Sequence, residues 1–207
     1  TGVWRAILRR ISLLTKMDLG HIPLGRLVSN LATGERTRAQ IASIAAHELS
    51  GVMLILDEPS AGLHTQDLHR VVKTLIEIRD RGNTLLVIDH HPVVLAAADQ
   101  EISLGPGTGP EGGKLTYQGP PRRLAPVSKA LYTAHKSEPN FAQIIGATGR
   151  NLKNLTLKFP LHRWTAIVGV SGSGKSTLVS RTLAPAIASE IGLSASPLPF
   201  DKITGLD

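Results

Sequence analysis

The chain of 207 residues has a hydrophobic fraction of 42%, which excludes a disordered protein, and no cysteine, which excludes disulfides, thiolate zinc sites and a cysteine nucleophile. Its formal net charge of +7 suits nucleic acid, an acidic membrane surface or a phosphate ligand as a partner, and equally an ordinary solvated surface. The sequence has no signal-peptide pattern, and no apolar run approaches the roughly 20 residues that span a bilayer. We therefore expect a soluble cytoplasmic protein with no membrane partner.

Hydrophobic periodicity predicts alternating helices and strands along the first 90 residues. Apolar residues at near-helical spacing predict helices over 3–16, 35–49 and 65–80. The short, continuous apolar runs Val52–Leu56 and Thr84–Ile88 are typical of strands that are buried on both faces of a parallel sheet. Strand, helix and strand in this order form the βαβ pattern, so the predicted fold class is α/β with a parallel sheet.

Glycine and proline dominate the centre of the chain. Residues 105–121 contain ten of them, and Lys114–Gln118 within this stretch is expected to form a short edge strand. Residues 122–140 are polar and interrupted by prolines, which is typical of a linker between domains.

A second unit is expected to begin near Phe141. Leu152–Phe159 alternates apolar and polar residues, as a half-exposed antiparallel strand does. Thr165–Val168 is predicted to be a buried strand and Lys175–Ala188 a helix.

Between this strand and this helix, the eight residues Gly169–Ser176 match the phosphate-loop pattern G-x-x-x-x-G-K-[ST], and Thr177 follows them. Glycines allow backbone N–H groups to close around phosphate oxygens, and the start of the helix adds its dipole. In this pattern Lys175 reaches the β- and γ-phosphates, and Ser176 is a ligand of Mg²⁺. The sequence therefore predicts a nucleotide-binding loop made of Gly169, Val170, Ser171, Gly172, Ser173, Gly174, Lys175, Ser176 and Thr177.

Two acids follow the apolar run at 52–56. Asp57 fits the carboxylate that holds the Mg²⁺ shell in phosphate-loop NTPases, and Glu58 fits the residue that polarises the attacking water. His90 follows the run at 84–88 and is a candidate for contacting the γ-phosphate and positioning that water. The structural alternatives are a pair of solvated acids at the end of a strand and a histidine without a catalytic role.

The order of these motifs is unusual. In a single phosphate-loop domain the loop precedes the acidic pair, whereas here Asp57 and Glu58 come first and no G-x-x-x-x-G-K lies upstream of them. The simplest explanation is the back of one nucleotide-binding half followed by the front of another. We expect residues 1–121 to be the C-terminal part of a first half, 122–140 a linker, and 141–207 the N-terminal part of a second half, in a window cut from a longer protein.

A family resemblance appears in the sequence around these motifs. Residues 31–38, 54–64 and 88–90 resemble the signature, Walker B, D-loop and H-loop series of ABC-type ATPases. Within that superfamily the chain resembles UvrA, the damage-recognition subunit of the bacterial excinuclease, over roughly residues 18–190. The stretches that narrow the resemblance are Leu63–His64, Ile102–Gly113, Gly146–Leu155 and Gly169–Ser176.

The resemblance implies a tandem ABC ATPase that uses ATP and Mg²⁺, forms a homodimer, scans duplex DNA for lesions and passes them to a UvrB-like excinuclease subunit in nucleotide excision repair. In ABC proteins each ATP lies between the phosphate loop of one half and the signature of the other. Lys175 and Ala32–Glu35 are then expected at one nucleotide, and Asp57, Glu58 and His90 at another. On this reading the chain alone holds two incomplete sites, and we expect little or no hydrolysis by it. The zinc modules of the family use cysteine pairs, so no zinc site is expected here.

The signature departs from the Leu-Ser-Gly-Gly-Glu pattern of the family. Here Ala32, Thr33, Gly34 and Glu35 follow Leu31, so the serine hydroxyl is absent and a β-branched residue stands where glycine allows a close approach or a positive φ. Backbone N–H groups at the start of the following helix can still bind phosphate. The alternatives that remain open are a non-catalytic nucleotide-binding protein, a resistance-type UvrA paralogue, and the ATP-binding subunit of an ABC transporter, against which the order of the motifs argues.

Overall fold

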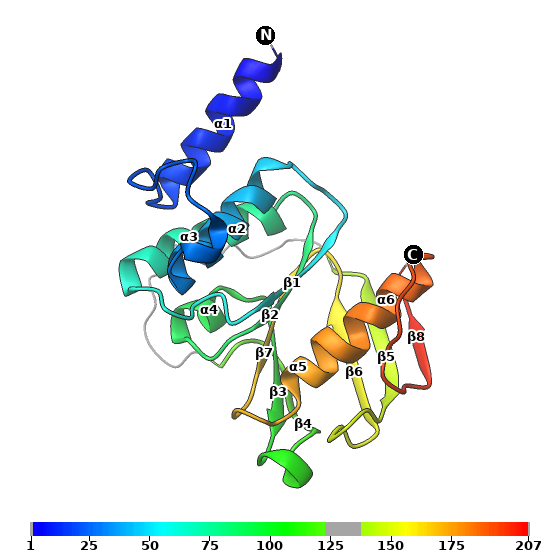
Figure 1. Ribbon diagram of the computed structural model, residues 1–207. Helices are drawn as coiled ribbons and strands as arrows, with labels where there is room; N and C mark the ends of the chain where they lie inside the picture. The colour runs from blue at the N-terminus through cyan, green and yellow to red at the C-terminus, as the bar shows by residue number, and fades with distance from the viewer. Residues whose placement is uncertain (1, 123–137, 207) are drawn as a thin grey trace.

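The centre of the molecule is a five-stranded sheet in the order β1-β2-β7-β3-β4 (Figure 1). The computed structural model describes residues 2–122 and 138–206, so most of the expected linker lies outside the described residues. β1, β2, β7 and β3 run parallel, and β4 is antiparallel to β3. The strands are β1 (Met53–Asp57), β2 (Thr84–Ile88), β3 (Gln100–Gly105), β4 (Lys114–Gly119) and β7 (Trp164–Val168).

β7 joins residues from both sides of the expected linker in one sheet. This strand follows the expected linker in the chain, yet it pairs with β2 along Leu85–Ile88 and with β3 along Gln100–Ser103. It is almost completely buried, and both of its edges are hydrogen-bonded to neighbouring parallel strands. In this chain, therefore, both predicted segments contribute to one sheet.

The side chains of the central strands alternate between two apolar layers. Leu85 and Val87 of β2 belong to the core beneath one set of helices, whereas Leu86 and Ile88 belong to the core on the opposite face. In β7, likewise, Trp164 belongs to the first core and Ile167 to the core on the opposite face. This is the period-2 alternation of strands covered on both faces.

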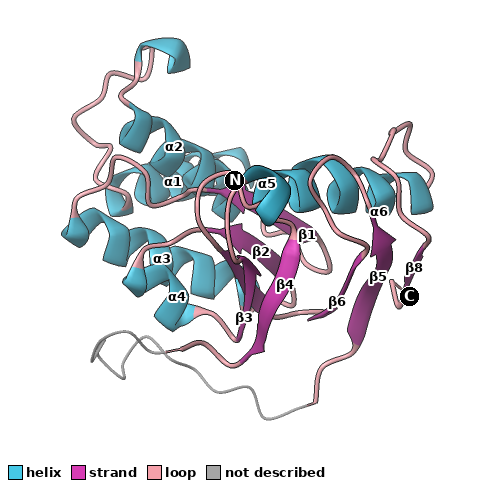
Figure 2. Ribbon diagram, turned by 90° about the horizontal axis from the view of Figure 1, so that it is seen from below, coloured by secondary structure: helices cyan, strands magenta, loops and turns pink. Residues whose placement is uncertain are grey.

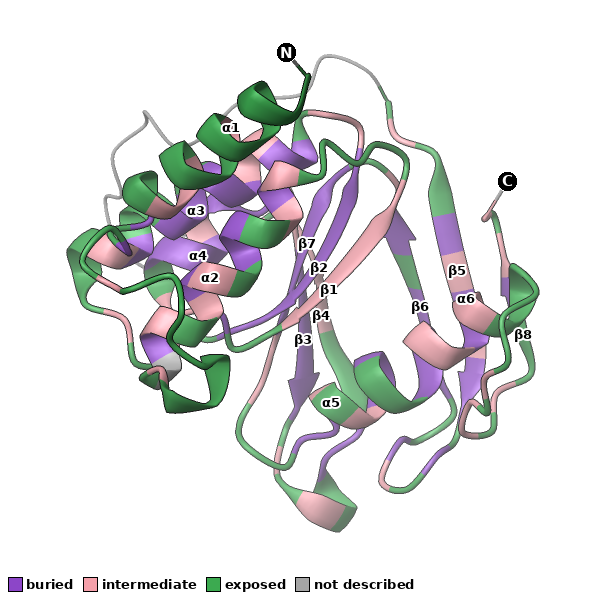
Figure 3. Ribbon diagram, turned by 45° about the horizontal axis from the view of Figure 1, so that its top comes forward, coloured by how far each residue is buried: buried purple, intermediate pink, exposed green. Residues whose placement is uncertain are grey.

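Helices α1 to α4 cover the first face (Figure 2). α3 contributes buried Leu68, Val71, Val72 and Leu75 to it, in agreement with the predicted helical spacing. α1 packs against α2 and has no buried residue, so it lies outermost in the burial view (Figure 3). Among the described residues no helix combines the length and the apolar character that crossing a membrane requires. The elements of this face are α1 (Gly2–Lys16), η1 (Val28–Asn30), α2 (Thr33–Ala46), α3 (Thr65–Arg79) and α4 (Pro92–Ala97).

A small antiparallel sheet, in the order β6-β5-β8, and a helical segment cover the second face. The helical segment continues directly from the phosphate loop and includes one π-helical stretch. β6 alternates buried and exposed residues, as predicted from the sequence. The elements are η2 (Gly109–Glu111), β5 (Phe141–Ala147), β6 (Leu155–Pro160), α5 (Lys175–Leu178), η4 (Val179–Leu183), α6 (Ala184–Glu190) and β8 (Lys202–Thr204).

The prediction for Val52–Leu56 was wrong in one respect. β1 forms there, but Met53–Leu56 are only half-buried rather than buried on both faces. The reason is its position at the edge of the sheet, where β2 is its single partner strand among the described residues.

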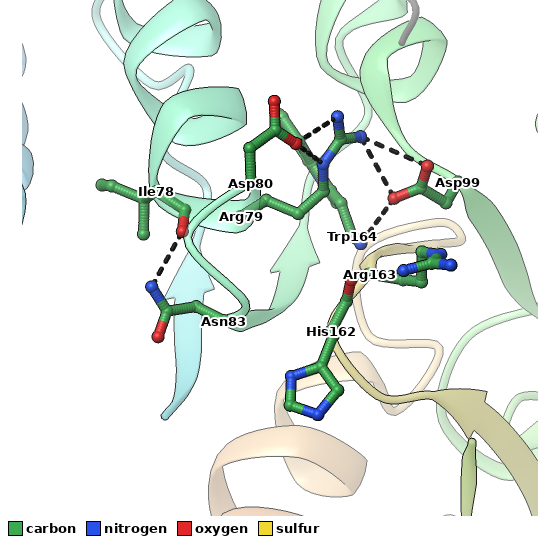
Figure 4. A network of polar contacts seen from close by, with 8 residues as sticks. All are labelled: Ile78, Arg79, Asp80, Asn83, Asp99, His162, Arg163 and Trp164. Carbon is green, nitrogen blue, oxygen red and sulfur yellow. Dashed lines mark hydrogen bonds and ion pairs between the residues drawn. The ribbon is translucent and has the colours of Figure 1, made fainter. Parts of the chain in front are cut away.

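A polar network joins the two segments at the amino-terminal ends of the parallel strands (Figure 4). The Arg79 side chain, which is 1% exposed, donates to Asp80 and, at 3.1–3.2 Å, to both carboxylate oxygens of Asp99. Asp99 in turn accepts a hydrogen bond of 2.8 Å from the backbone N–H of Trp164, at the start of β7. The backbone N–H of His162 donates to Thr84 Oγ1 at 2.7 Å. The network therefore anchors β7 to helix α3 and strand β2 at the end opposite the phosphate loop.

Candidate nucleotide-binding site

The phosphate loop lies where the sequence predicts it, between β7 and α5 at the carboxyl edge of the sheet. Gly169, Gly172 and Gly174 have positive φ values of 146°, 76° and 103°. A Cβ on Gly169 would lie 2.3 Å from the carbonyl oxygen of Leu104, so only glycine fits at the start of the loop. Helix α5 then begins at Lys175 with its free N–H groups toward the loop, as an anion-binding site requires.

Lys175 lies at the centre of the site. Its Nζ donates to the carbonyl oxygens of Gly169 and Val170 at 2.9 and 3.0 Å. One cavity of about 810 Å³ and one of about 160 Å³ lie beside it, and Lys175, Ser171 and Glu58 line both. The ammonium group is thus held within reach of both spaces into which phosphate oxygens could enter.

Ser176 and Asp57 lie next to each other. Ser176 Oγ donates to Asp57 Oδ2 over 3.3 Å, although the two residues are 119 positions apart in the chain. A hydroxyl and a carboxylate suit Mg²⁺, which usually takes one or two carboxylates, with water and substrate phosphates as its other ligands. Accordingly, the described residues include no cluster of three or more His, Cys, Asp or Glu side chains that could hold a metal ion by themselves. These two residues are candidates for holding Mg²⁺, and they are in contact in this structure. That they serve different sites in the complete protein stays a prediction.

Glu58 and His90 complete the edge of the larger cavity. Glu58 is exposed and has a positive φ of 48°, an uncommon backbone conformation for a residue other than glycine that is typical of turns. Its N–H donates to the carbonyl oxygen of Ile88 over 2.8 Å, which fixes this turn to the end of β2. The side chains of Glu58 and His90 are exposed and therefore available to a ligand.

Asp89 supports this edge, a role that was not predicted from the sequence. Its carboxylate is completely buried and accepts from Ser60 Oγ at 2.7 Å and from the N–H groups of Ser60, His90 and His91 at 2.7–3.0 Å. It thereby joins the turn after Glu58 to the turn that carries His90. The sequence signal for Asp89 is an acid between an apolar strand and a histidine. An acid that is exposed to solvent occurs in the same pattern, so the pattern does not reveal that Asp89 is buried.

The signature residues lie apart from this site. Ala32, Gly34 and Glu35, whose positions the structure describes, are not among the residues lining either cavity at Lys175. Thr33 is the first residue of helix α2. Gly34 is required for packing, because a Cβ there would lie 2.7 Å from the carbonyl oxygen of Gly62. Within this chain, then, the signature meets the turn after Glu58 and not the phosphate loop.

Glu35 closes the start of α2. Its carboxylate accepts a 2.9 Å hydrogen bond from the backbone N–H of Ala32, which lowers the pKa of Glu35, and His21 and Arg26 lower it further. In a capping box the first residue also accepts a bond through its side chain, which alanine cannot do. The start of α2 therefore has only one of the two hydrogen bonds of a capping box. The backbone N–H that a capping side chain would bind stays available to another ligand.

The glycine-rich stretch after β3 packs its backbone onto the phosphate loop. Gly109 N donates to Gly172 O at 3.1 Å, and Gly113 N donates to Ser173 O at 2.9 Å. Asn151 Nδ2 also donates to Gly172 O, at 3.0 Å. These contacts give the Gly/Pro-rich segment and the asparagine a physical role: they fix the carbonyl groups of Gly172 and Ser173 and with them the conformation of the phosphate loop.

We expect Gly112→Ala to weaken binding of an ATP analogue in the presence of Mg²⁺ about tenfold, or about 1.4 kcal/mol. Gly112 has an ordinary φ of −82°, so alanine meets no backbone strain there. Its Cβ, however, would lie 3.1 Å from Ser173 Cα and 2.9 Å from Gly107 O, which forces the phosphate loop to move. Gly25→Ala is the matched control, because a Cβ there meets no atom within 4 Å. Equal affinities of the two variants, measured by fluorescence titration, would contradict this role.

Comparisons with known proteins agree with the motifs. No protein-family model matches the chain. It is 37% identical to UvrABC system protein A of Streptococcus pneumoniae over 99% of this chain and 23% of that protein, and 38% identical to the protein of the same name from Bacillus subtilis over the same shares. Among solved structures, UvrA2 from Deinococcus radiodurans is similar with a TM-score of 0.54 and 36% identity over 94% of this chain and 25% of that one. The resemblance to UvrA and the α/β phosphate-loop fold of ABC type are thus confirmed, and the chain spans about a quarter of the length of these relatives.

Proposed function

The chain is related to the UvrA proteins along nearly its whole length, and from this premise we propose that it is the ATP-binding part of a UvrA-like damage-recognition ATPase in bacterial nucleotide excision repair. One observation carries the nucleotide-binding part of the proposal. Lys175 and Ser176 of the phosphate loop lie at the carboxyl edge of a parallel sheet beside Asp57 and Glu58, with cavities between them. This is the edge at which open α/β sheets bind their ligands.

Each side chain has a proposed role in nucleotide binding. Lys175 and the loop N–H groups hold the β- and γ-phosphates of one nucleotide, with Ser176 as a ligand of its Mg²⁺, and Asp57 is a ligand of the Mg²⁺ at the other nucleotide of the complete protein. The metal, when bound, neutralises charge that develops on the phosphates. Glu58 accepts a proton from the attacking water, and His90 contacts the γ-phosphate and orients that water.

We propose the following organisation for the complete protein. Residues 1–121 belong to a first ATPase half, 122–140 to a linker and 141–207 to a second half. The signature at Ala32–Glu35 then faces the nucleotide on Lys175 from the other half, and Asp57, Glu58 and His90 serve a phosphate loop outside this chain. The reversed order of the motifs and the partial coverage of the relatives support this division.

The proposed partners follow from the family and not from individual residues. They are lesion-bearing duplex DNA, a second copy of the protein and a UvrB-like subunit, in the cytoplasm. The net charge of +7 suits the first of these partners. A second candidate function is nucleotide-dependent clamping without efficient hydrolysis, which is favoured by Ala32, because alanine offers no hydroxyl to a γ-phosphate.

The test is ATP hydrolysis by the natural gene product that contains this chain, assayed with undamaged and with lesion-bearing duplex DNA. We expect stimulation by the damaged duplex, and loss of part or all of the hydrolysis in Lys175→Ala. Lys73→Ala, an exposed position on α3, is the control. Tight nucleotide binding with no hydrolysis on either DNA would favour the clamping function. Hydrolysis that is indifferent to damaged DNA would overturn the repair function.

A further inference from the structure

We propose that helix α1 and the groove between α1 and α2 form a docking surface for a partner protein that presents an acidic amphipathic helix. The surface belongs to the helical face of the molecule, and none of its residues lines the cavities at Lys175. The proposal therefore goes beyond nucleotide binding and does not depend on it.

One side of α1 is apolar and exposed. The helix lies at the outside of the helical face in both Figure 1 and Figure 3. Its exposed apolar side chains recur at intervals of three and four residues, which places them on one side of a helix. They are Val3, Trp4, Ile7, Leu8 and Ile11, and each is between 40 and 76% exposed. A contiguous apolar stripe of this kind is typical of an interaction site.

The other side of α1 holds the helix in place. Arg9 forms an ion pair with Glu48, which follows α2. Lys16 Nζ lies 2.7 Å from both carboxylate oxygens of Glu77 on α3, and Met17, directly after the helix, is completely buried. These contacts set the orientation of α1, and they leave the apolar stripe toward solvent.

A groove of about 310 Å³ lies between α1 and α2. Its apolar lining comes from one leucine of α1 and from small residues of α2, namely Leu14, Ala39, Ala42 and Ala46. Arg10 also lines the groove and lies one helical turn from Ile7, so the groove and the apolar stripe adjoin. A bulky apolar side chain on a partner helix fits such a groove, as in other helix-in-groove complexes. The surface of a bilayer is too flat to enter it.

The charge of α1 favours an acidic partner. The helix has four basic residues and no acidic residue. Two of them, Arg5 and Arg10, are exposed and form no ion pair within the described ranges 2–122 and 138–206. Glutamates on a partner helix would complement both. A second copy of α1 would bring only like charges, and duplex DNA has no apolar surface for the stripe.

Trp4 makes the binding directly measurable. The chain has two tryptophans, of which Trp4 is 69% exposed and Trp164 is completely buried, so a change in tryptophan emission on titration reports contact at α1. The probe is a synthetic helical peptide with leucines on one face and glutamates on the other. A second peptide has lysines in place of the glutamates. We expect a blue shift of the emission with the glutamate peptide and none with the lysine peptide. Equal shifts with the two peptides would overturn the proposed charge complementarity.

Three exposed positions test the location of the surface without disturbing either apolar core. Ile7→Glu and Arg10→Glu should each weaken binding of the glutamate peptide to the 207-residue chain about tenfold or more, because they remove an apolar contact and a complementary charge. Lys73→Glu on α3 is the matched control, since it changes the net charge as much as Arg10→Glu does, and it should leave the affinity unchanged. Equal losses in Arg10→Glu and Lys73→Glu would mean that overall charge attracts the peptide, and would overturn the docking surface.

Other occupants give different results. Vesicles of anionic phospholipid and duplex DNA should leave the emission of Trp4 unchanged, and a blue shift with either one would overturn the protein partner. In the natural gene product that contains this chain, hydroxyl radicals should oxidise Trp4 as fast as in the chain itself, and the glutamate peptide should slow this oxidation. Slow oxidation before any peptide is added would mean that another part of the product covers α1, and would overturn the docking of a separate protein.

Discussion

Replacement of Arg79 by methionine is expected to lower the free energy of unfolding of the chain by about 3–5 kcal/mol. The guanidinium group is 1% exposed and bridges Asp80 with Asp99. The Asp80 side chain is 43% exposed and can return to water, whereas the Asp99 side chain is only 13% exposed. The variant therefore removes two charge-assisted hydrogen bonds from a largely buried carboxylate, and this loss is the main part of the expected effect.

Methionine is chosen because it retains most of the apolar volume of the arginine side chain. A decrease in the free energy of unfolding then cannot be attributed to a cavity. Arg70→Met on the same helix is the matched control. Arg70 is 47% exposed and contacts Asp18 and Asp67 at 3.5 and 3.6 Å, so its removal should cost no more than about 1 kcal/mol. Urea unfolding followed by circular dichroism measures both variants.

The position of the network makes this prediction informative about the fold. Asp99 also binds the N–H of Trp164, so disturbing it loosens the start of β7 (Figure 4). Exchange of the Trp164 amide should therefore increase in Arg79→Met and stay unchanged in Arg70→Met. If the two variants unfolded at the same urea concentration, the network would contribute nothing to the attachment of β7.

The elements that the sequence predicted well are those whose signal is local. The helix at 65–79 and the strands at 84–88 and 164–168 have strong hydrophobic patterns, and the phosphate loop has fixed glycines at fixed spacings. Such patterns depend on neighbours within a few positions, so a single sequence reveals them. The fold class follows from their alternation.

The features that the sequence did not predict depend on distant partners. β3 contains Glu101 and Ser103, polar residues that argue against a buried strand. Both are buried because Arg122 donates to the Glu101 carboxylate and to Ser103 Oγ from 19 to 21 positions away. A pattern of apolar residues cannot reveal this compensation.

The insertion of β7 between β2 and β3 is the second such feature. The order of the motifs along the chain favours two separate halves. The sequence of Thr165–Val168 predicts a strand but does not reveal which strands it pairs with. Only the register that links Ile88 with Ile167 and Ile102 with Ile167 makes the two segments one sheet. The proximity of Asp57 to Ser176 is a direct consequence of that register and was not predictable from the order of motifs.

Asp89 gives the second large prediction. Asp89→Asn is expected to lower the free energy of unfolding by about 1.5–3 kcal/mol, the range for a hydrogen bond to a charged group. An asparagine has one oxygen in place of two, whereas in the chain Oδ1 and Oδ2 of Asp89 both accept. The Ser60 N–H that bonds Oδ2 then faces an amide NH₂ or a rotated side chain, and one of the partly buried donors remains unsatisfied.

The same change should loosen the candidate site locally. The amides of Ser60, His90 and His91 all donate to Asp89, so we expect faster hydrogen exchange at one or more of them, at conditions where the amides of β2 remain protected. Glu77→Gln, which breaks the exposed ion pair with Lys16, is the stability control and should cost no more than about 1 kcal/mol. Unfolding free energies that are equal in the two variants, with unchanged exchange at Ser60, would mean that the turns carrying Glu58 and His90 are held by their own backbone bonds. The expected result would instead make Asp89 the positioning residue that keeps both turns in place around the larger cavity.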